Sequence, residues 1–232
     1  MAEALLFDFF GTLVEYRAAR VGHAYPQTVE LAQSLGFDGD HDQFASAWDT
    51  SMSALEREGR ATLQEFSMLD VAVAFCAGNA LPCSEPEMAA LGRSFVGEWA
   101  YHVVPIDGVA EMLARLAADH RIAVVSNTHD RNMVPDMLVA MGVADLMTAV
   151  VLSVDHGWQK PHHSIYEAAI DQIGSAPGST VFIGDNVEAD HAGPKRMGMQ
   201  AFLIDPADVH GVPATERLAT VLDLEGALRS SG

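Results

Sequence analysis

Short, wholly apolar runs alternate with amphipathic helical patterns in this chain, and this alternation most limits how it can fold. Strands that are apolar at every position are buried on both faces, so helices must cover both sides of a parallel sheet. The predicted strands are Ala4–Phe7, Ile122–Val125, Ala149–Ser153, Val181–Ile183 and Ala201–Ile204. The predicted helices between them are Val109–Ala118, Asn132–Met141, His163–Ile173 and Ala189–Met197. The pattern indicates an α/β core with helices on both faces.

The long gap between the first two predicted strands carries helical patterns only. Four helix-like stretches fill it, with breaks expected at 36–39, at Gly59 and at 79–82; the stretches are Tyr25–Leu35, His41–Glu58, Thr62–Ala77 and Glu85–Tyr101. An all-helical insert in an α/β core is typical of a cap domain. We therefore expect a core formed by residues 1–15 and 105–232 and a helical cap domain at 16–104, with hinges near 13–16 and 105–108.

Charge and cysteine content exclude several classes of function. The 232 residues carry a formal net charge of −19, with 32 acidic and 13 basic residues, so no basic face for nucleic acid or an anionic membrane is expected. A small anionic substrate stays possible, because a metal and a few local cations set the field inside a pocket. Cys76 and Cys83 have neither zinc-site nor C-x-x-C spacing. Without a basic leader or an apolar span, the chain is expected to be cytoplasmic, as a monomer or homodimer.

Polar residues that could do chemistry follow the predicted strands directly. Ligands of an open parallel sheet bind beyond the carboxyl ends of its strands, so side chains at those ends are expected to meet. The segments that follow strands are Asp8-Phe9-Phe10-Gly11-Thr12, Ser126-Asn127-Thr128-His129-Asp130, Gly157-Trp158-Gln159-Lys160-Pro161 and Gly184-Asp185-Asn186 with Asp190. Singly, each could be a helix cap, a turn or a surface residue. Their combination at one edge indicates a reactive site.

The residue types at this edge suit metal-assisted attack on a phosphoryl group. Asp8, Asp185 and Asp190 offer the oxygen ligands that Mg²⁺ prefers. The metal and Lys160, one of only two lysines in the chain, would neutralise the phosphoryl group while Asp8 attacks it. Hydrogen bonds to the transferring oxygens would come from Ser126 and Thr12.

These motifs resemble the haloacid dehalogenase-like hydrolase superfamily, in the branch with a helical cap inserted after the first motif. The likeness covers essentially the whole chain and implies a Rossmann-like core. It makes Asp8 the residue that forms a covalent intermediate, and it implies Mg²⁺ bound by Asp8, Asp185, Asp190 and the Phe10 carbonyl, with Asp190 as ligand or as partner of a ligand. The residues expected to be catalytic are Asp8, Thr12, Ser126 and Lys160. Those expected around the substrate are Ser126, Asn127, Lys160, Phe10 and Gly11.

One position departs from the phosphatase pattern of the superfamily. Phosphatases carry an acid–base aspartate where this chain has Phe10, and losing such help typically costs about 10²–10⁴-fold in rate. His129 is a candidate substitute; further candidates are His102, His156, His162, His163 and His191. Alternatively, the substrate has a leaving group that needs no proton, as in an acyl or aryl phosphate.

Two other branches of the superfamily lack that aspartate. The phosphonate hydrolases need a cap lysine, and residues 16–104 contain none. The 2-haloacid dehalogenases have an aromatic residue at this position and need no metal, but they lack the Gly184-Asp185 pair. They also use a cap arginine where this chain has Asp49, although Arg17, Arg20, Arg57 or Arg60 could serve. We therefore predict Mg²⁺-dependent hydrolysis of a small organic phosphate, with dehalogenation second and a non-catalytic phosphate-binding module third.

Overall fold

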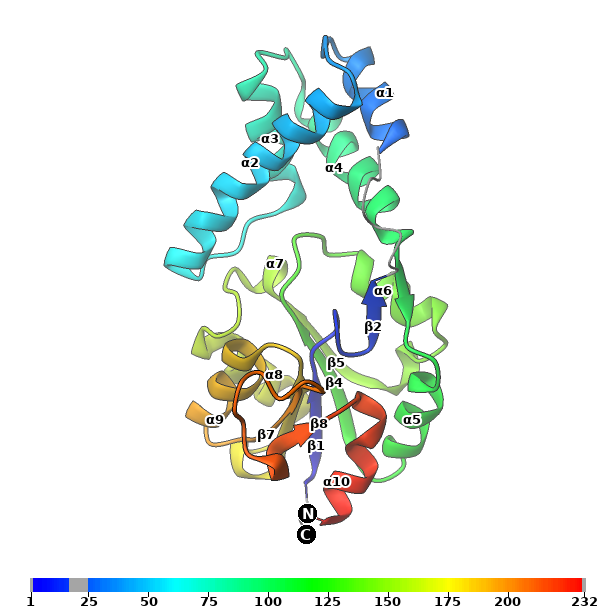
Figure 1. Cartoon of the computed structure of the whole chain (residues 1–232), viewed down its shortest axis with the longest axis vertical. Coiled ribbons are helices and arrows are strands. Elements are labelled where there is room, and N and C mark those ends of the chain that lie inside the picture. Colours follow the sequence, from blue (N-terminus) through cyan, green and yellow to red (C-terminus); the bar gives the residue numbers. More distant parts are fainter. Residues whose placement is uncertain (1, 17–24, 231–232) are drawn as a thin grey trace. The chain divides into compact units, whose positions relative to one another are not determined.

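The computed structural model describes residues 2–16 and 25–230, and it divides the chain into two compact units (Figure 1). One unit comprises Met1–Glu15 and Pro105–Gly232, and the other comprises Tyr16–Val104. The first unit contains the sheet and the second is helical apart from its margins. The predicted α/β fold with a helical insert is confirmed.

The sheet of the first unit has six parallel strands in the order β5-β4-β1-β6-β7-β8. Their bounds are β1 Ala4–Phe7, β4 Arg121–Ser126, β5 Met147–Leu152, β6 Thr180–Gly184, β7 Gln200–Ile204 and β8 Arg217–Leu218. Every residue of β1 is fully buried, as expected for an apolar strand with neighbours on both sides. The five predicted strands are present, and β8 is an addition at the edge.

The register of the central strands places the candidate residues at one edge. Phe7, the last residue of β1, pairs with Val124 of β4 and with Ile183 of β6. The next residue, Asp8, donates its main-chain N–H to the Ile183 carbonyl at 2.8 Å. The carboxyl ends of the three strands therefore meet, and the loops that follow them lie together.

Helices cover both faces of this sheet, with α8 and α9 on one side and α5 and α10 on the other in Figure 1. The helices are α5 Val109–Leu116, α6 Met133–Ala140, α7 Ser153–His156, α8 His163–Ile173, α9 Gly193–Arg196 and α10 Leu224–Ser230. Helix α8 packs Ile165, Ala169 and Ile173 into the same apolar cluster as Leu6 and Phe182 of the sheet. This spacing of four residues puts one face of the helix on the core.

The segment predicted as one helix over Ala189–Met197 is instead two short ones. A turn of π-helix spans Val187–Ala192, and α9 follows it. Pro194 cannot donate a main-chain hydrogen bond to a continuous helix. A Cβ on Gly193 would lie 2.3 Å from the Tyr166 hydroxyl, so the chain passes very close to α8. The widened turn carries Asp190.

The helical unit has four helices in its described part: α1 Pro26–Ser34, α2 His41–Thr62, α3 Met68–Gly78 and α4 Glu85–Ala100. The break predicted at Gly59 was wrong, because α2 runs through it to Thr62. One glycine costs a helix only about 1 kcal/mol, which helix-forming neighbours offset. Helix α3 begins at Met68 rather than at Thr62, since Ser67 and Asp70 form a capping box there.

Aromatic side chains form the core of the helical unit. Trp48 stacks on Phe44 and Phe95, with ring centroids 5.5 and 4.8 Å apart, and Phe75 lies 5.4 Å from Trp48. The free Cys76 is buried in the same cluster. These contacts give the unit an apolar core of its own.

A small two-stranded sheet was not expected from the sequence. Strand β2, Val14–Tyr16, pairs with β3, Val103–Pro105, where the chain leaves and re-enters the first unit. Each strand has three residues, which is too short for a pattern of alternation to stand out.

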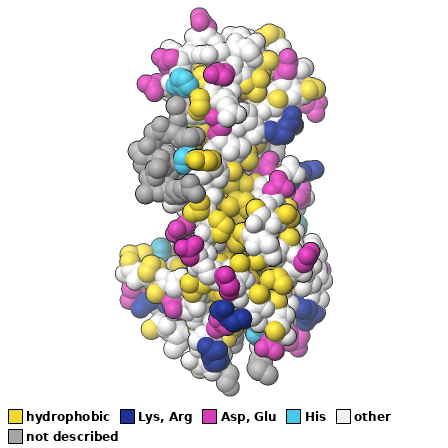
Figure 2. Space-filling view, turned by 90° about the vertical axis from the view of Figure 1, so that its right-hand side faces the viewer, with side chains coloured by type: hydrophobic (Ala, Val, Ile, Leu, Met, Phe, Trp, Pro, Cys, Tyr) yellow, Lys and Arg dark blue, Asp and Glu magenta, His cyan; other side chains and the backbone are white. Residues whose placement is uncertain are grey.

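Acidic side chains are scattered over the face shown in Figure 2, where lysine and arginine occur at few places. Among the residues described, no helix combines the length and the apolar character needed to cross a membrane.

Candidate active site

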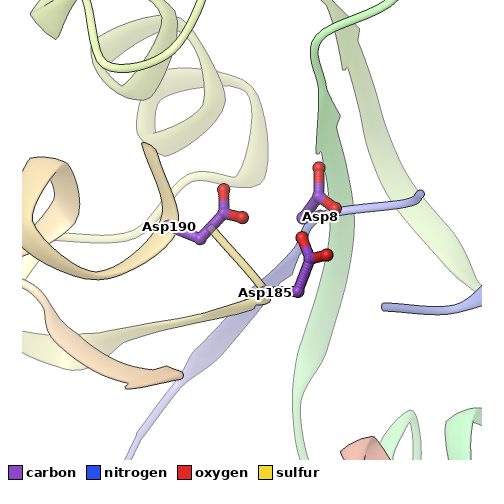
Figure 3. A group of neighbouring side chains, drawn as sticks. All are labelled: Asp8, Asp185 and Asp190. Carbon is purple, nitrogen blue, oxygen red and sulfur yellow. The ribbon is translucent and has the colours of Figure 1, made fainter. Parts of the chain in front are cut away.

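Three carboxylates gather at the carboxyl edge of the sheet (Figure 3). Asp8 follows β1, Asp185 follows β6, and Asp190 lies in the π-helical turn after β6. One carboxylate oxygen from each lies within 4.8 Å of the others. Asp8 and Asp190 are 7% and 1% exposed, whereas Asp185 is more open. Such a set of hard oxygen donors suits a divalent cation such as Mg²⁺.

Lys160 inserts its ammonium between two of these carboxylates. Its Nζ lies 2.7 Å from Asp8 Oδ1 and 2.7 Å from Asp190 Oδ1, and the residue is 4% exposed. Burial alone would lower the pKa of Lys160, but the charges of Asp190 and Asp8 outweigh it and raise that pKa. The other lysine, Lys195, pairs with Glu216 instead.

Charge is not balanced within this group. Three carboxylates face one ammonium, so the cluster carries a net charge of −2 when all three carboxylates are ionised. A bound divalent cation would offset this negative charge. The donor set and the charge of the site therefore both fit Mg²⁺.

The Asp8 carboxylate is held at both oxygens. Lys160 binds Oδ1, and the Thr12 hydroxyl donates to Oδ2 at 3.2 Å. Burial raises the pKa of Asp8 to about 7; Lys160 opposes this, while the charges of Asp190 and Asp185 add to it. A cation bound beside Asp8 would favour the ionised carboxylate and so lower the pKa of Asp8.

Asp190 is fixed by two charge-assisted hydrogen bonds. Its Oδ1 accepts from Lys160, and its Oδ2 accepts from the Asn186 main-chain N–H at 3.0 Å. The Asn186 side chain in turn caps the turn by accepting from the N–H groups of Glu188 and Ala189. Asn186 was predicted to follow the strand with Gly184 and Asp185 but was given no role, although an asparagine before a helical segment is a typical N-cap.

Two glycines permit this close packing. A Cβ on Gly184 would lie 2.4 Å from the Cβ of Asp190. Gly11, with φ of +81°, has no room either, because a Cβ there would lie 2.2 Å from Asp185 Oδ2. Gly11 was expected from the sequence to lie beside the substrate, and in the structure its missing side chain leaves room for Asp185.

Ser126, Asn127 and Phe10, three further residues predicted for the site, differ in their surroundings. Ser126 is fully buried, and its hydroxyl makes a long 3.4 Å contact to the Asn127 carbonyl. The Asn127 side chain binds the main chain of Lys160 at both of its ends. Phe10 is half-buried, with its ring edge-on to Phe9 at 5.1 Å between centroids.

Several candidate substitutes for the missing acid–base group are engaged elsewhere. His191 contacts Glu216 at 2.8 Å, while His156 and His162 both contact the Ser164 hydroxyl at 2.8 Å.

Among the arginines considered for the cap arginine of a dehalogenase, Arg60 pairs with Glu56 within the helical unit. Arg17 and Arg20 lie outside the described residues.

Comparison with known proteins gives the chain a family. Residues 80–204, more than half of the chain, match the profile of the family described as haloacid dehalogenase-like hydrolase. A curated relative, ribulose-1,5-bisphosphate 5-phosphatase of Halopiger xanaduensis, is 24% identical over 100% of this chain and 97% of its own length.

Solved structures share the fold. A 2-haloacid dehalogenase from Pseudomonas syringae pv. Tomato superposes with a TM-score of 0.72 at 18% identity, covering 100% of both chains. An HAD phosphatase from Thermococcus onnurineus gives a TM-score of 0.65 at 22% identity, covering 97% of both chains. At these identities the likeness concerns the fold alone. With the matched profile, it follows that the chain is an enzyme of the haloacid dehalogenase-like hydrolase family.

Proposed function

We propose that this enzyme hydrolyses a small organic phosphate with the aid of Mg²⁺, using Asp8 as the nucleophile. The observation that supports this most is the position of the Asp8 carboxylate, next to the Lys160 ammonium and to the acidic pair Asp185 and Asp190. A nucleophile that attacks a phosphoryl group needs positive charge beside it to offset the anionic substrate, and this site offers both an ammonium and a set of cation ligands.

Each residue of the site has a separate role in the proposed reaction. When bound by Asp8, Asp185 and Asp190, with the Phe10 carbonyl as a further ligand, Mg²⁺ would supply positive charge to the phosphoryl oxygens. Lys160 would hold those oxygens, and Thr12 orients the attacking carboxylate. Ser126 would donate a hydrogen bond to the transferring group. An Asp8 oxygen forms a bond to phosphorus as the ester oxygen leaves with its electron pair, and water then attacks phosphorus and restores Asp8.

Phe10 limits the substrates that fit this scheme. A phenyl ring cannot protonate a departing alkoxide, and such help is worth about 10²–10⁴-fold. Leaving groups that are stable as anions, as in aryl and acyl phosphates, need it least. We therefore expect better turnover of these than of simple alkyl phosphates, unless another group such as His129 donates the proton.

The phosphatase of Halopiger xanaduensis, which matches this chain over 97% of its own length, supports a phosphate ester as the substrate class. Because that relative is named for a sugar bisphosphate, sugar phosphates are the first natural substrates to test. We further propose that the helical unit, Tyr16–Val104, serves as the cap that excludes water during the reaction, and that the enzyme works in the reducing cytoplasm, which its two free cysteines fit.

Dehalogenation is the second candidate, and Phe10 is the observation that favours it. In that reaction Asp8 would displace halide from carbon, and no metal would be required. The Gly184-Asp185 pair and the excess negative charge of the site favour the phosphatase.

The test is hydrolysis of an aryl phosphate with Mg²⁺ and with EDTA, alongside halide release from chloroacetate. We expect phosphate release that stops with EDTA and with Asp8→Asn. The matched control Asp171→Asn, an exposed aspartate on α8, should retain full activity. Phosphate release undiminished by EDTA would refute the metal-dependent scheme, and metal-free halide release would establish the dehalogenase.

A further inference from the structure

The Asn127 side chain connects the end of β4 to the main chain of Lys160. Its Oδ1 accepts a hydrogen bond from the Lys160 N–H at 2.7 Å, and its Nδ2 donates to the Lys160 carbonyl at 3.0 Å. A carboxamide has one accepting and one donating end, and here both are directed at one residue. Asn127 directly follows the last residue of β4, so these bonds tie Lys160 to the sheet.

A second pair of contacts joins the same two segments, and here the main-chain groups belong to Thr128 and the side chain to Ser153. The Thr128 N–H donates to the Ser153 hydroxyl oxygen at 2.8 Å, and that hydroxyl contacts the Thr128 carbonyl at 3.3 Å. Ser153 is fully buried and begins α7. The segment from 153 to 160 is therefore attached at both ends to the dipeptide 127–128. We call Asn127, Thr128, Ser153 and Lys160 the β4 clip.

The clip matters because lysine has a long, flexible side chain. Its ammonium reaches Asp8 and Asp190 at once, with 2.7 Å to each, and this requires a fixed starting point for the four-carbon stem. A displacement of about 1 Å at a reacting group can cost up to about 10²-fold in rate. Anchoring both main-chain groups of Lys160 to a strand end supplies that fixed point.

We propose that Asn127 is a positioning residue that acts through Lys160, and that its side chain does not bind the substrate. Each end of the amide already has a partner on Lys160, which favours positioning over the substrate contact expected from the sequence. The proposal rests on the proposed function for its kinetic consequence, since Lys160 acts there on the phosphoryl group. Its structural part can be tested without any turnover.

The test uses the fact that the chain has only two lysines, Lys160 and Lys195. Labelling with ¹⁵N-lysine gives one main-chain and one Nζ signal for each in an NMR spectrum. In Asn127→Ala, hydrogen exchange at the Lys160 amide should accelerate by about tenfold or more, because its acceptor is lost. The Lys160 Nζ signal should also shift or broaden, while the signals of Lys195 serve as an internal reference.

Asn79→Ala is the matched control, because the Asn79 amide also donates to a main-chain carbonyl, that of Phe75 at 2.8 Å, in the helical unit. It should leave all lysine signals in place. If Asn127→Ala fails to fold, Asn127→Asp keeps the acceptor for the Lys160 N–H, while it replaces the donor with a second acceptor and adds a negative charge. It should leave the Lys160 amide protected, whereas Asn127→Ala, which adds no charge, tests the response of Nζ. An unchanged Nζ signal in the folded Asn127 variant would overturn the proposal.

Kinetics separate positioning from substrate contact. With an aryl phosphate and Mg²⁺, Asn127→Ala should lower kcat by about tenfold or more, and Ser153→Ala should lower it in the same direction. In a Lys160→Ala background, Asn127→Ala should cause no further loss, because it acts only through that lysine. Additive losses would show an independent contact and contradict the proposal. If the unaltered enzyme shows no turnover, the proposed function is refuted. The lysine spectra would still show whether Asn127 positions Lys160.

Discussion

Replacing Gly184 with alanine should be one of the most damaging single-methyl additions in this protein. The added Cβ would lie 2.4 Å from the Cβ, Cγ and Oδ2 atoms of Asp190, about 1 Å inside normal contact. The φ angle of Gly184 is not in the left-handed region, so the backbone itself accepts alanine. The cost is therefore steric and falls on the buried Asp190.

The magnitude follows from what holds Asp190 in place. Asp190 cannot retreat without loosening its hydrogen bonds to Lys160 and to the Asn186 N–H. Overpacking typically costs about 1–3 kcal/mol, and a hydrogen bond to a charged group contributes about 1.5–3 kcal/mol. With partial relief by side-chain movement, we expect a loss of about 3 kcal/mol, or roughly 10²-fold in the folded-to-unfolded ratio.

Urea unfolding followed by circular dichroism measures this loss, with Gly178→Ala as the matched control. No atom lies within 4 Å of a Cβ built on Gly178, whose φ is not positive either, so the same chemical change should be nearly neutral. The unfolding midpoint of Gly184→Ala should fall by about 1 M or more. Equal midpoints for the two variants would refute the packing argument.

Three further predictions concern proton transfer, pH and the helical unit. Phe10→Asp should raise kcat on alkyl phosphates relative to aryl phosphates by about tenfold or more, since it restores an acid–base group; an unchanged ratio would mean that another residue already protonates the leaving group. Burial, followed by the charges of neighbouring histidines, lowers the pKa of His162, whose neutral Nδ1 caps α8 at the Ser164 N–H. The stabilisation from this His162 cap should be complete above the pKa of histidine in the unfolded chain, about 6.5. It should be lost as the pH falls through the lower pKa of His162 in the folded protein. His162→Asn keeps a capping group that does not titrate, so urea midpoints should then vary less with pH, and an unaltered pH profile would contradict this. Glu98→Ala removes the carboxylate that accepts both the N–H and the hydroxyl of Thr28, and should destabilise the protein by about 2 kcal/mol in thermal unfolding; a loss below about 0.5 kcal/mol would show that water replaces it.

The sheet was predictable because its strands are buried on both faces. Runs such as Ala4–Phe7 are apolar at every position, and β1 has those bounds in the structure. Strand β8 has only two residues, Arg217 and Leu218, and forms because β7 offers an open edge. Helix α2 runs through Gly59 because the neighbouring residues and the packing of the helix outweigh the propensity of one residue.

The candidate site was predictable as a set of strand ends but not as a set of contacts. Parallel strands place their carboxyl ends at one edge, which is why Asp8 and Asp185 could be grouped from the sequence. That the amide of Asn127 would bind the main chain of Lys160 depends on a contact between residues 33 apart in the sequence. Such long-range pairings leave no local pattern to read.

The most direct test of the proposed reaction is to identify the covalent intermediate by mass spectrometry. The enzyme would be mixed with Mg²⁺ and an acyl or aryl phosphate, quenched in acid and digested. We predict that the peptide containing Asp8 gains the mass of one phosphoryl group, and that this gain disappears with EDTA and in Asp8→Asn. A phosphoryl group on any other residue, or phosphate release while Asp8 stays unmodified at every quench time, would contradict the central claim.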